Sequence, residues 1–255
     1  MIVADPNYFP AKAFELASVL SKVHEKGVTF LYVPTGKEKD IHEVERDMAE
    51  WCSLYAEELT QPLNYHILED DFTDFMESNE VRSVIFELIP DSLYPNCKKP
   101  LKLCRELRIA YYFLKPNQEI NFKKVLVPVG FLVEEKEKGV FCSGMGRLPH
   151  SEILLMTAND YGSRAKENAA GIRTVLDKFK ISHSDIPAQK NSFKIELEAV
   201  KKAKELHAGL LLISASRDYG LDDIIFGPKE QKVIEKSEIP VMVINPRKDL
   251  YALCE

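Results

Sequence analysis

The feature that most constrains this chain of 255 residues is an internal repeat of five short apolar runs. The runs occur in the same order in both halves, and matching runs lie roughly 118 to 130 positions apart, about one domain's length. The first set is IVAD (2–5), VTFLYVP (28–34), NYHILED (64–70), SVIFELIP (83–90) and IAYYFLKP (109–116). The second set is VPVG (127–130), EILLMTA (152–158), SHSDIPA (182–188), GLLLISAS (209–216) and IPVMVINP (239–246).

Segments with the spacing of amphipathic helices separate these runs, which gives a strand–helix alternation in each half. Short, nearly continuous apolar strands are typical of a parallel sheet covered on both faces. The polar segment 115–124 contains a proline and precedes the second set, so we place a domain boundary there. The sequence therefore predicts an α/β protein of two tandem five-stranded, parallel-sheet, three-layer domains, residues 1–118 and 119–255.

The least regular part of the second repeat is segment 134–149, which holds three glycines. We expect the helix there to be short or irregular. The same segment contains CSGMG (142–146), but no strand immediately precedes this G-x-G and it lacks the third glycine of a dinucleotide loop. We therefore interpret it as a helix irregularity.

Composition excludes several classes of protein. The net charge of −6 and the pI near 5.7 do not fit a basic nucleic-acid-binding face. No apolar stretch approaches the roughly 20 residues of a membrane span, and no leader-like segment precedes the first apolar run. The five cysteines are scattered without a C-x-x-C pair, so we expect reduced thiols and no zinc site. These features predict a cytoplasmic protein without nucleic-acid or membrane partners.

In open parallel sheets, ligands bind outside the carboxyl ends of the strands where the strand order reverses. The fourth strand of the second repeat is followed there by SASRDYGLDDIIFGPKEQKVIEKSEIPVMVINP (214–246). This segment resembles the C-terminal signature of the universal stress protein family, in which G-x-x-G, nine residues and G-[S/T] hold the ribose and phosphates of ATP. The spacing is retained as Ser214-x-x-Arg217, nine residues and Gly227-Pro228. The resemblance extends over the whole chain as a two-repeat member and implies the adenine nucleotide hydrolase-like fold.

The departures from that signature predict a degenerate nucleotide site. Ser214 and Arg217 replace glycines that would let backbone approach phosphate closely, and Pro228 removes a hydroxyl and an N–H donor. The adenine-contacting acid of the family corresponds to Gly130 in the second repeat. The first repeat keeps that acid as Asp5, but no glycine loop follows its fourth strand.

The candidate nucleotide-binding residues are therefore those at the ends of the first and fourth strands. They are Asp5, Gly130, Ser214, Ser216, Arg217, Gly220 and Gly227. We expect no resident cofactor and at most weak binding of ATP or AMP. Arg217 is alternatively a solvated surface residue, or a donor to a phosphate or carboxylate of another ligand.

Other chemistry is not indicated. The acidic cluster Glu69, Asp70, Asp71 and Asp74 lacks the spacing of a calcium loop and fits a helix cap. No nucleophile, base and orienting group are spaced for one another, so we predict neither catalytic residues nor a metal site. A flavodoxin-type redox enzyme would need a phosphate loop after a first strand, and neither repeat has one.

We therefore expect a non-catalytic, stress-associated regulatory or binding protein. The alternative is an adenine-nucleotide-binding switch or slow ATPase. Both fifth strands are apolar and would otherwise form exposed sheet edges, so we expect the repeats to pair as an intramolecular pseudo-dimer. A homodimer of the chain is implied by the resemblance alone.

Overall fold

The computed structural model describes residues 1–34, 40–216 and 228–247, which form two compact units. Unit 1 comprises Met1–Gln118 and unit 2 comprises Glu119–Glu255. Each unit is described by itself below.

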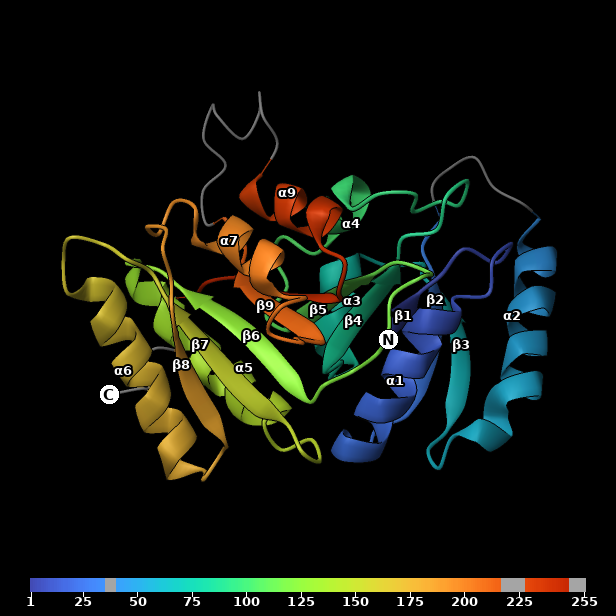
Figure 1. Ribbon diagram of the computed structural model, residues 1–255. Helices are drawn as coiled ribbons and strands as arrows, with labels where there is room; N and C mark the ends of the chain where they lie inside the picture. The colour runs from blue at the N-terminus through green and yellow to red at the C-terminus, as the bar shows by residue number, and fades with distance from the viewer. Residues whose placement is uncertain (35–39, 217–227, 248–255) are drawn as a thin grey trace. The chain divides into compact units, whose positions relative to one another are not determined.

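Unit 1 contains a parallel sheet of five strands in the order β3-β2-β1-β4-β5 (Figure 1). Its strands are β1 (Ile2–Val3), β2 (Val28–Tyr32), β3 (Leu63–Ile67), β4 (Ser83–Glu87) and β5 (Ala110–Leu114). The short strand β1 lies between β2 and β4, where Ile2 is in register with Phe30 and Ile85. All three side chains are buried, so the centre of the sheet carries the core of this unit.

The helices of unit 1 are α1 (Ala11–His24), α2 (Ile41–Tyr55) with a short 3-10 extension (Ala56–Glu58), α3 (Phe72–Ser78) and α4 (Lys98–Leu103). Asp71 begins α3 as an N-cap, because its Oδ1 accepts hydrogen bonds from the backbone N–H groups of Thr73 (2.8 Å) and Asp74 (3.2 Å). The interpretation of the acidic cluster as a helix cap is therefore confirmed.

Unit 2 repeats the same strand order with its own elements, β10-β9-β6-β7-β8, and all of these pairings are parallel. Its strands are β6 (Lys124–Val129), β7 (Glu152–Thr157), β8 (His183–Pro187), β9 (Leu210–Ser214) and β10 (Val241–Ile244). In chain order within each unit, the third strand lies at one edge and the fifth at the other. The predicted parallel, five-stranded α/β layering is confirmed.

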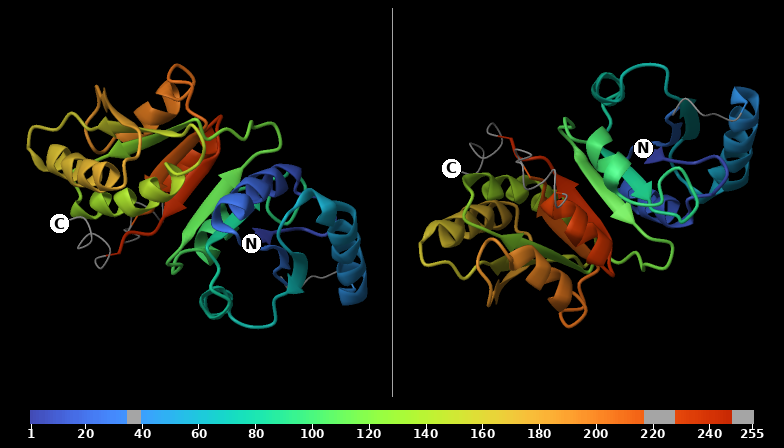
Figure 2. Two further views of the ribbon diagram at one scale, coloured as in Figure 1. Left: turned by 90° about the horizontal axis from the view of Figure 1, so that it is seen from below. Right: turned by 90° about the horizontal axis from the view of Figure 1, so that it is seen from above.

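The helices of unit 2 cover both faces of its sheet, with α5 and α6 on one face and α7 on the other (Figure 2). They are α5 (Lys138–Met145), α6 (Arg164–Lys178), α7 (Ile195–Lys202) and α9 (Lys229–Lys236), and α7 packs against α9. The segment after β6 is a 3-10 turn (Val133–Glu137) followed directly by the eight-residue α5. This confirms the expected short, irregular first helix.

The amphipathic segment 194–209, between the third and fourth runs of the second set, is helical only in its first part. The α-helix α7 ends at Lys202, and the chain continues through a turn in which His207 adopts a left-handed φ of 53°. The turn leads to Gly209, whose position against the backbone of Asn121 leaves no room for a Cβ atom. Glycine is therefore required where the chain enters β9.

Two further features of the described part of the chain are its cysteines and the length of its helices. Cys52, Cys97, Cys104 and Cys142 form no disulfide bond within the described ranges, and Cys254 lies outside them. Among the helices of the described ranges, none is long and apolar enough to cross a membrane.

Candidate functional site

The strand order of each unit reverses direction next to its first strand, which makes the carboxyl edge there the expected ligand position. The neighbouring strands are β1 and β4 in unit 1, and β6 and β9 in unit 2. Four predicted site residues are described and lie at these two edges: Asp5, Gly130, Ser214 and Ser216. Arg217, Gly220 and Gly227 lie outside the described residues.

In unit 1, Asp5 follows β1 at the predicted place, but its carboxylate is bonded within the protein. One oxygen accepts hydrogen bonds from the backbone N–H (2.9 Å) and the side-chain Nδ2 (2.8 Å) of Asn7. The other oxygen accepts from the backbone N–H of Leu93 (2.8 Å), in the loop after β4. Asp5 is only 6% exposed. It therefore joins the loops that follow β1 and β4.

A second buried acid, Glu87, ends β4 and caps the neighbouring helix. Its Oε2 accepts hydrogen bonds from the backbone N–H groups of Lys12 (2.8 Å) and Ala13 (3.0 Å), in the first turn of α1. Burial raises the pKa of the Glu87 carboxyl, against the opposing effect of these two N–H donors. A helix N-terminus in this fold class is a position for anions, and here a side chain of the protein occupies it. The signal in the sequence was an acid at the end of the apolar run SVIFE.

A cavity of about 240 Å³ lies beside the loop after β1. Its walls include Phe9, which stacks on Tyr55 with ring centroids 4.2 Å apart, and Trp51, whose ring meets Phe9 edge-on at 5.5 Å. Pockets for drug-sized ligands are typically about 300–1,000 Å³. This cavity is therefore smaller than an adenine nucleotide normally requires.

In unit 2, Gly130 follows β6, and its backbone N–H donates to Oε2 of Glu135 at 2.8 Å. The same oxygen accepts from Nζ of Lys138 at 2.8 Å, and Lys138 also donates to the carbonyl oxygen of Pro128 at 2.6 Å. Lys138 is 0% exposed. Burial works against ionisation of Glu135, but Lys138, Lys229 and the hydrogen bonds hold the pKa of its carboxyl below the usual range. Glu135 and Lys138 therefore form a buried ion pair whose two partners both belong to unit 2.

The space beside Gly130 is also filled from the opposite loop. A Cβ atom at Gly130 would lie 3.1 Å from Oγ of Ser192, which accepts from the backbone N–H of Phe131 at 2.9 Å. Asp160 fixes Ser192 by accepting hydrogen bonds from its backbone N–H (2.9 Å) and its hydroxyl. On the other side, the buried Asn168 Nδ2 donates to the carbonyl oxygen of Gly130 at 2.9 Å. A side chain at position 130 would therefore meet Ser192.

At the end of β9, the two predicted serines differ. The backbone N–H and hydroxyl of Ser216 donate to Oε2 of Glu230 at 3.1 and 2.9 Å, and Glu230 lies in the first turn of α9. Ser214 is 6% exposed, and its buried hydroxyl has no hydrogen-bond partner among the described residues. The backbone N–H of Ser216 is therefore already bonded to Glu230, whereas the hydroxyl of Ser214 has no such partner among the described residues.

A second ion pair, between an exposed lysine and a buried glutamate, lies close to the first. Nζ of Lys229, the first residue of α9, is 2.9 Å from Oε1 of Glu196. Glu196 is 4% exposed, and its Oε2 has no hydrogen-bond partner in the described ranges. Burial raises the pKa of this carboxyl, with Lys229 acting in the opposite direction. Because Lys229 also lowers the pKa of Glu135, the two pairs form one electrostatic cluster.

Sequence reasoning missed this cluster. Glu135 and Lys138 belong to the run EEKEK, which has the composition of a solvated surface, and Glu196 and Lys229 are 33 positions apart. The available signal was the spacing of Glu135 and Lys138, three residues apart in the segment that follows a strand. In the described part of the chain, no group of three or more His, Cys, Asp or Glu side chains could hold a metal ion.

Comparisons with known proteins add a finding about the fold. Models of known protein families give no match to the chain, and curated protein sequences give none. Solved structures do match. A universal stress protein from Archaeoglobus fulgidus DSM 4304 has a TM-score of 0.63 at 14% identity, with 97% of each chain covered. A provisionally assigned universal stress protein from Pseudomonas aeruginosa UCBPP-PA14 has a TM-score of 0.65 at 16% identity, covering 99% of this chain and 95% of its own.

The chain has the fold of the universal stress proteins. A protein of unknown function from Pseudomonas aeruginosa PAO1 has the same fold, with a TM-score of 0.63 at 15% identity over 99% of this chain and 94% of its own. At these identities the likeness establishes the fold alone. The chemistry of the two carboxyl edges must therefore be argued from the residues of this chain.

Proposed function

We propose that this protein is a universal-stress-protein-like regulatory or binding protein, non-catalytic, in which the nucleotide site of each of two tandem repeats has degenerated. The observation that carries the proposal is the bond from the N–H of Gly130 to the carboxylate of Glu135, which Lys138 neutralises. A phosphate or a purine would have to displace a charged, buried side chain to reach this backbone. Displacement of such a pair costs several kcal/mol.

At the other edge positions too, a carboxylate of the protein accepts hydrogen bonds from the backbone N–H groups that a ligand could otherwise use. Asp5 holds the N–H of Leu93, Glu87 holds two N–H groups of α1, and Glu230 holds the N–H of Ser216. Backbone N–H groups at such edges are the donors that bind phosphate in related architectures. Carboxylates that already accept these bonds also repel an approaching phosphate.

The proposal of a non-catalytic protein rests on the state of these acids. A general base must be free to accept a proton from a substrate, whereas Asp5 and Glu135 each accept two or three hydrogen bonds from the protein itself. The lowered pKa of Glu135 makes it a weaker base still.

The second candidate function, an adenine-nucleotide-binding switch or slow ATPase, is favoured by one observation. The buried hydroxyl of Ser214 lies at the carboxyl end of β9, and Lys229 opens the helix α9. A hydroxyl donor and a cation at a helix N-terminus are suited to an anionic ligand. Weak binding of ATP or AMP in unit 2 would use these two groups.

Calorimetric titration with MgATP and with AMP separates the two candidates. The first predicts Kd values of about a millimolar or weaker, since each lost charge-assisted hydrogen bond costs about 1.5–3 kcal/mol. The second candidate would be favoured if the protein bound either nucleotide at micromolar concentration and Lys229→Gln abolished this binding. The matched control Lys236→Gln, in the last turn of the same helix, should then leave binding unchanged. Lys236 is exposed and has the same charge.

The remaining parts of the proposal concern assembly and place. Pairing of the two repeats as a pseudo-dimer, a homodimer of the chain, a role in stress and a cytoplasmic location stay predictions. Native mass spectrometry of the purified protein tests the homodimer and detects any co-purifying small molecule in the same spectrum.

A further inference from the structure

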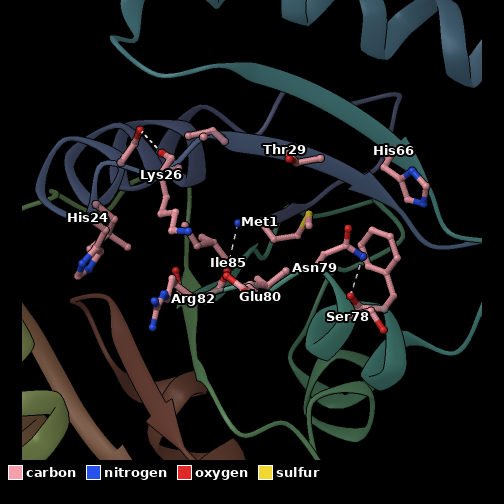
Figure 3. Close-up of a pocket in the computed structure, with 18 residues that line it drawn as sticks. Met1, His24, Lys26, Thr29, His66, Ser78, Asn79, Glu80, Arg82 and Ile85 are labelled. Carbon is pink, nitrogen blue, oxygen red and sulfur yellow. Dashed lines mark hydrogen bonds between the residues drawn. The ribbon is translucent and has the colours of Figure 1, made fainter.

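A larger cavity lies in unit 1 at the opposite edge of the sheet, by the amino ends of β1, β2 and β4. Its volume is about 630 Å³, within the range of about 300–1,000 Å³ that is usual for small-molecule pockets. It is an open cavity lined by the C-terminal half of α1, the turn from α1 to β2, the end of α3 and the turn from α3 to β4 (Figure 3). All of its lining residues belong to unit 1 and are described.

Two tight turns shape this cavity. After α1 the chain turns at Glu25, which adopts a left-handed φ of 52°, and the hydroxyl of Ser21 donates to the carbonyl oxygen of Lys26 at 2.6 Å. After α3 it turns at Glu80, with a φ of 48°, and Asn79 Nδ2 donates to the carbonyl oxygen of Phe75 at 2.9 Å. The turns are thus fixed by local hydrogen bonds, and the walls they form are pre-organised.

The α1–β2 turn also passes very close to the start of β3. A Cβ atom at Gly27 would lie 2.9 Å from the carbonyl oxygen of Pro62. Only glycine fits this approach, so the turn that carries Lys26 is held against the rest of the unit.

The charges of the cavity are mainly positive. Lys26 and Arg82 lie on the same side of it with His24, whereas Ser78, Asn79 and His66 lie on the other side (Figure 3). In the described part of the chain, neither the ammonium of Lys26 nor the guanidinium of Arg82 forms an ion pair. Glu80 is the one acid among the lining residues. Two cations from separate turns thus line one cavity.

Part of the remaining lining is apolar and suits a small apolar body. The ring of Phe75 stacks on His66, with centroids 4.5 Å apart and an angle of 11° between their planes. Leu20, Val81 and Ile85 also line the cavity. A pocket with apolar walls and a few convergent charged groups is the usual form of a site for a small organic ligand.

We propose that unit 1 binds a small organic anion in this cavity, an apolar body with one carboxylate or phosphate group, and that Lys26 and Arg82 bind the acidic group. Arginine and lysine form strong charge-assisted hydrogen bonds with both kinds of oxyanion. This site is separate from the carboxyl edges and does not depend on whether a nucleotide binds there.

Calorimetry with three probes that share one ring system tests the proposal. The probes are 1-naphthoate, 1-naphthyl phosphate and the uncharged 1-naphthol. We expect at least one of the two anions to bind at least tenfold more tightly than the alcohol, because only the anions form charge-assisted hydrogen bonds with Lys26 and Arg82. Which anion binds more tightly identifies the acidic group of the natural ligand.

Lys26→Gln and Arg82→Gln should each weaken binding of the preferred anion by about tenfold or more. Both residues are exposed, so their substitution leaves the fold intact, which the thermal unfolding midpoint checks. Lys22→Gln is the matched control, because Lys22 is an exposed lysine of α1 outside the cavity lining. Equal binding of all three probes, binding of none of them, or an equal loss in the Lys22 variant would overturn the proposal.

Discussion

Replacement of Lys138 by methionine tests the closed ion pair at the carboxyl edge of unit 2. Methionine retains most of the buried apolar volume but removes the cation that lies 2.8 Å from Glu135 and 2.6 Å from the carbonyl oxygen of Pro128. Removal of one partner of a buried pair costs about 3–5 kcal/mol, because the remaining charge is uncompensated. Lys138 is fully buried, so solvent does not screen this loss. We therefore expect Lys138→Met to lower the free energy of unfolding by about that amount at pH 7.

Urea denaturation followed by circular dichroism measures this difference, and hydrogen exchange of peptides from β6 locates it in unit 2. Lys204→Met is the control, since Lys204 is exposed on the turn after α7. The double variant Lys138→Met/Glu135→Gln should regain most of the stability, because neither charge is then left buried. Exposed ion pairs contribute less than about 1 kcal/mol. If Lys138→Met lowers the free energy of unfolding by no more than that, the buried ion pair does not hold the carboxyl edge of unit 2 as we infer.

The pH dependence of the stability of Lys138→Met provides a second test of the same ion pair. The folded-state pKa of Glu135 is lowered, so the stabilisation is present above the unfolded pKa of about 4.3 and is lost as the pH falls through the folded value. In Lys138→Met the carboxyl stays buried without its cation, so its pKa rises. The deficit of the variant should therefore be smaller at pH 4 than at pH 7.

Three further predictions concern the edges. Asp5→Ala should lower the free energy of unfolding by about 1–3 kcal/mol, because the N–H of Leu93 loses its acceptor, and should leave ATP titrations unchanged. The folded-state pKa of Glu87 is raised, so the stabilisation from this carboxyl is greatest below its unfolded pKa and falls as the pH rises through its folded pKa. In Glu87→Gln, the urea denaturation midpoint should therefore depend less on pH between these two pKa values than in the unmodified protein. Gly130→Asp should destabilise by about 1–3 kcal/mol through overpacking against Ser192, and Ser192→Gly in the same chain should recover it, as thermal unfolding would show; an equal loss in the double variant would contradict this account.

The sequence predicted the sheet well because its strands are apolar runs of the right length. All ten runs overlap a strand of the structure, and even the polar run SHSDIPA forms the edge strand β8. The glycines of segment 134–149 correctly indicated an irregular helix. Helix ends were less predictable: α7 ends at Lys202, and the chain then turns toward Gly209, whose close approach to Asn121 no local pattern reveals.

The site was only partly predictable. Asp5 and Gly130 lie at the edges where the resemblance placed them, since strand order follows from the alternation of elements. Their partners are distant in sequence or resemble surface residues: Leu93 is 88 positions from Asp5, and Lys138 lies in a charged run. Burial of a lysine depends on how the helix after β6 packs, and composition argues against such burial.

The bond between Gly130 and Glu135 also has a thermodynamic consequence for the protein in a cell. A protein that binds a metabolite gains stability by mass action, so its folded fraction rises and falls with the concentration of that metabolite. Where a protein's own carboxylate takes the ligand's place, the effective concentration of the substitute is fixed by the covalent chain. Under the proposed function, the stability of unit 2 should therefore not change with the concentration of adenine nucleotides.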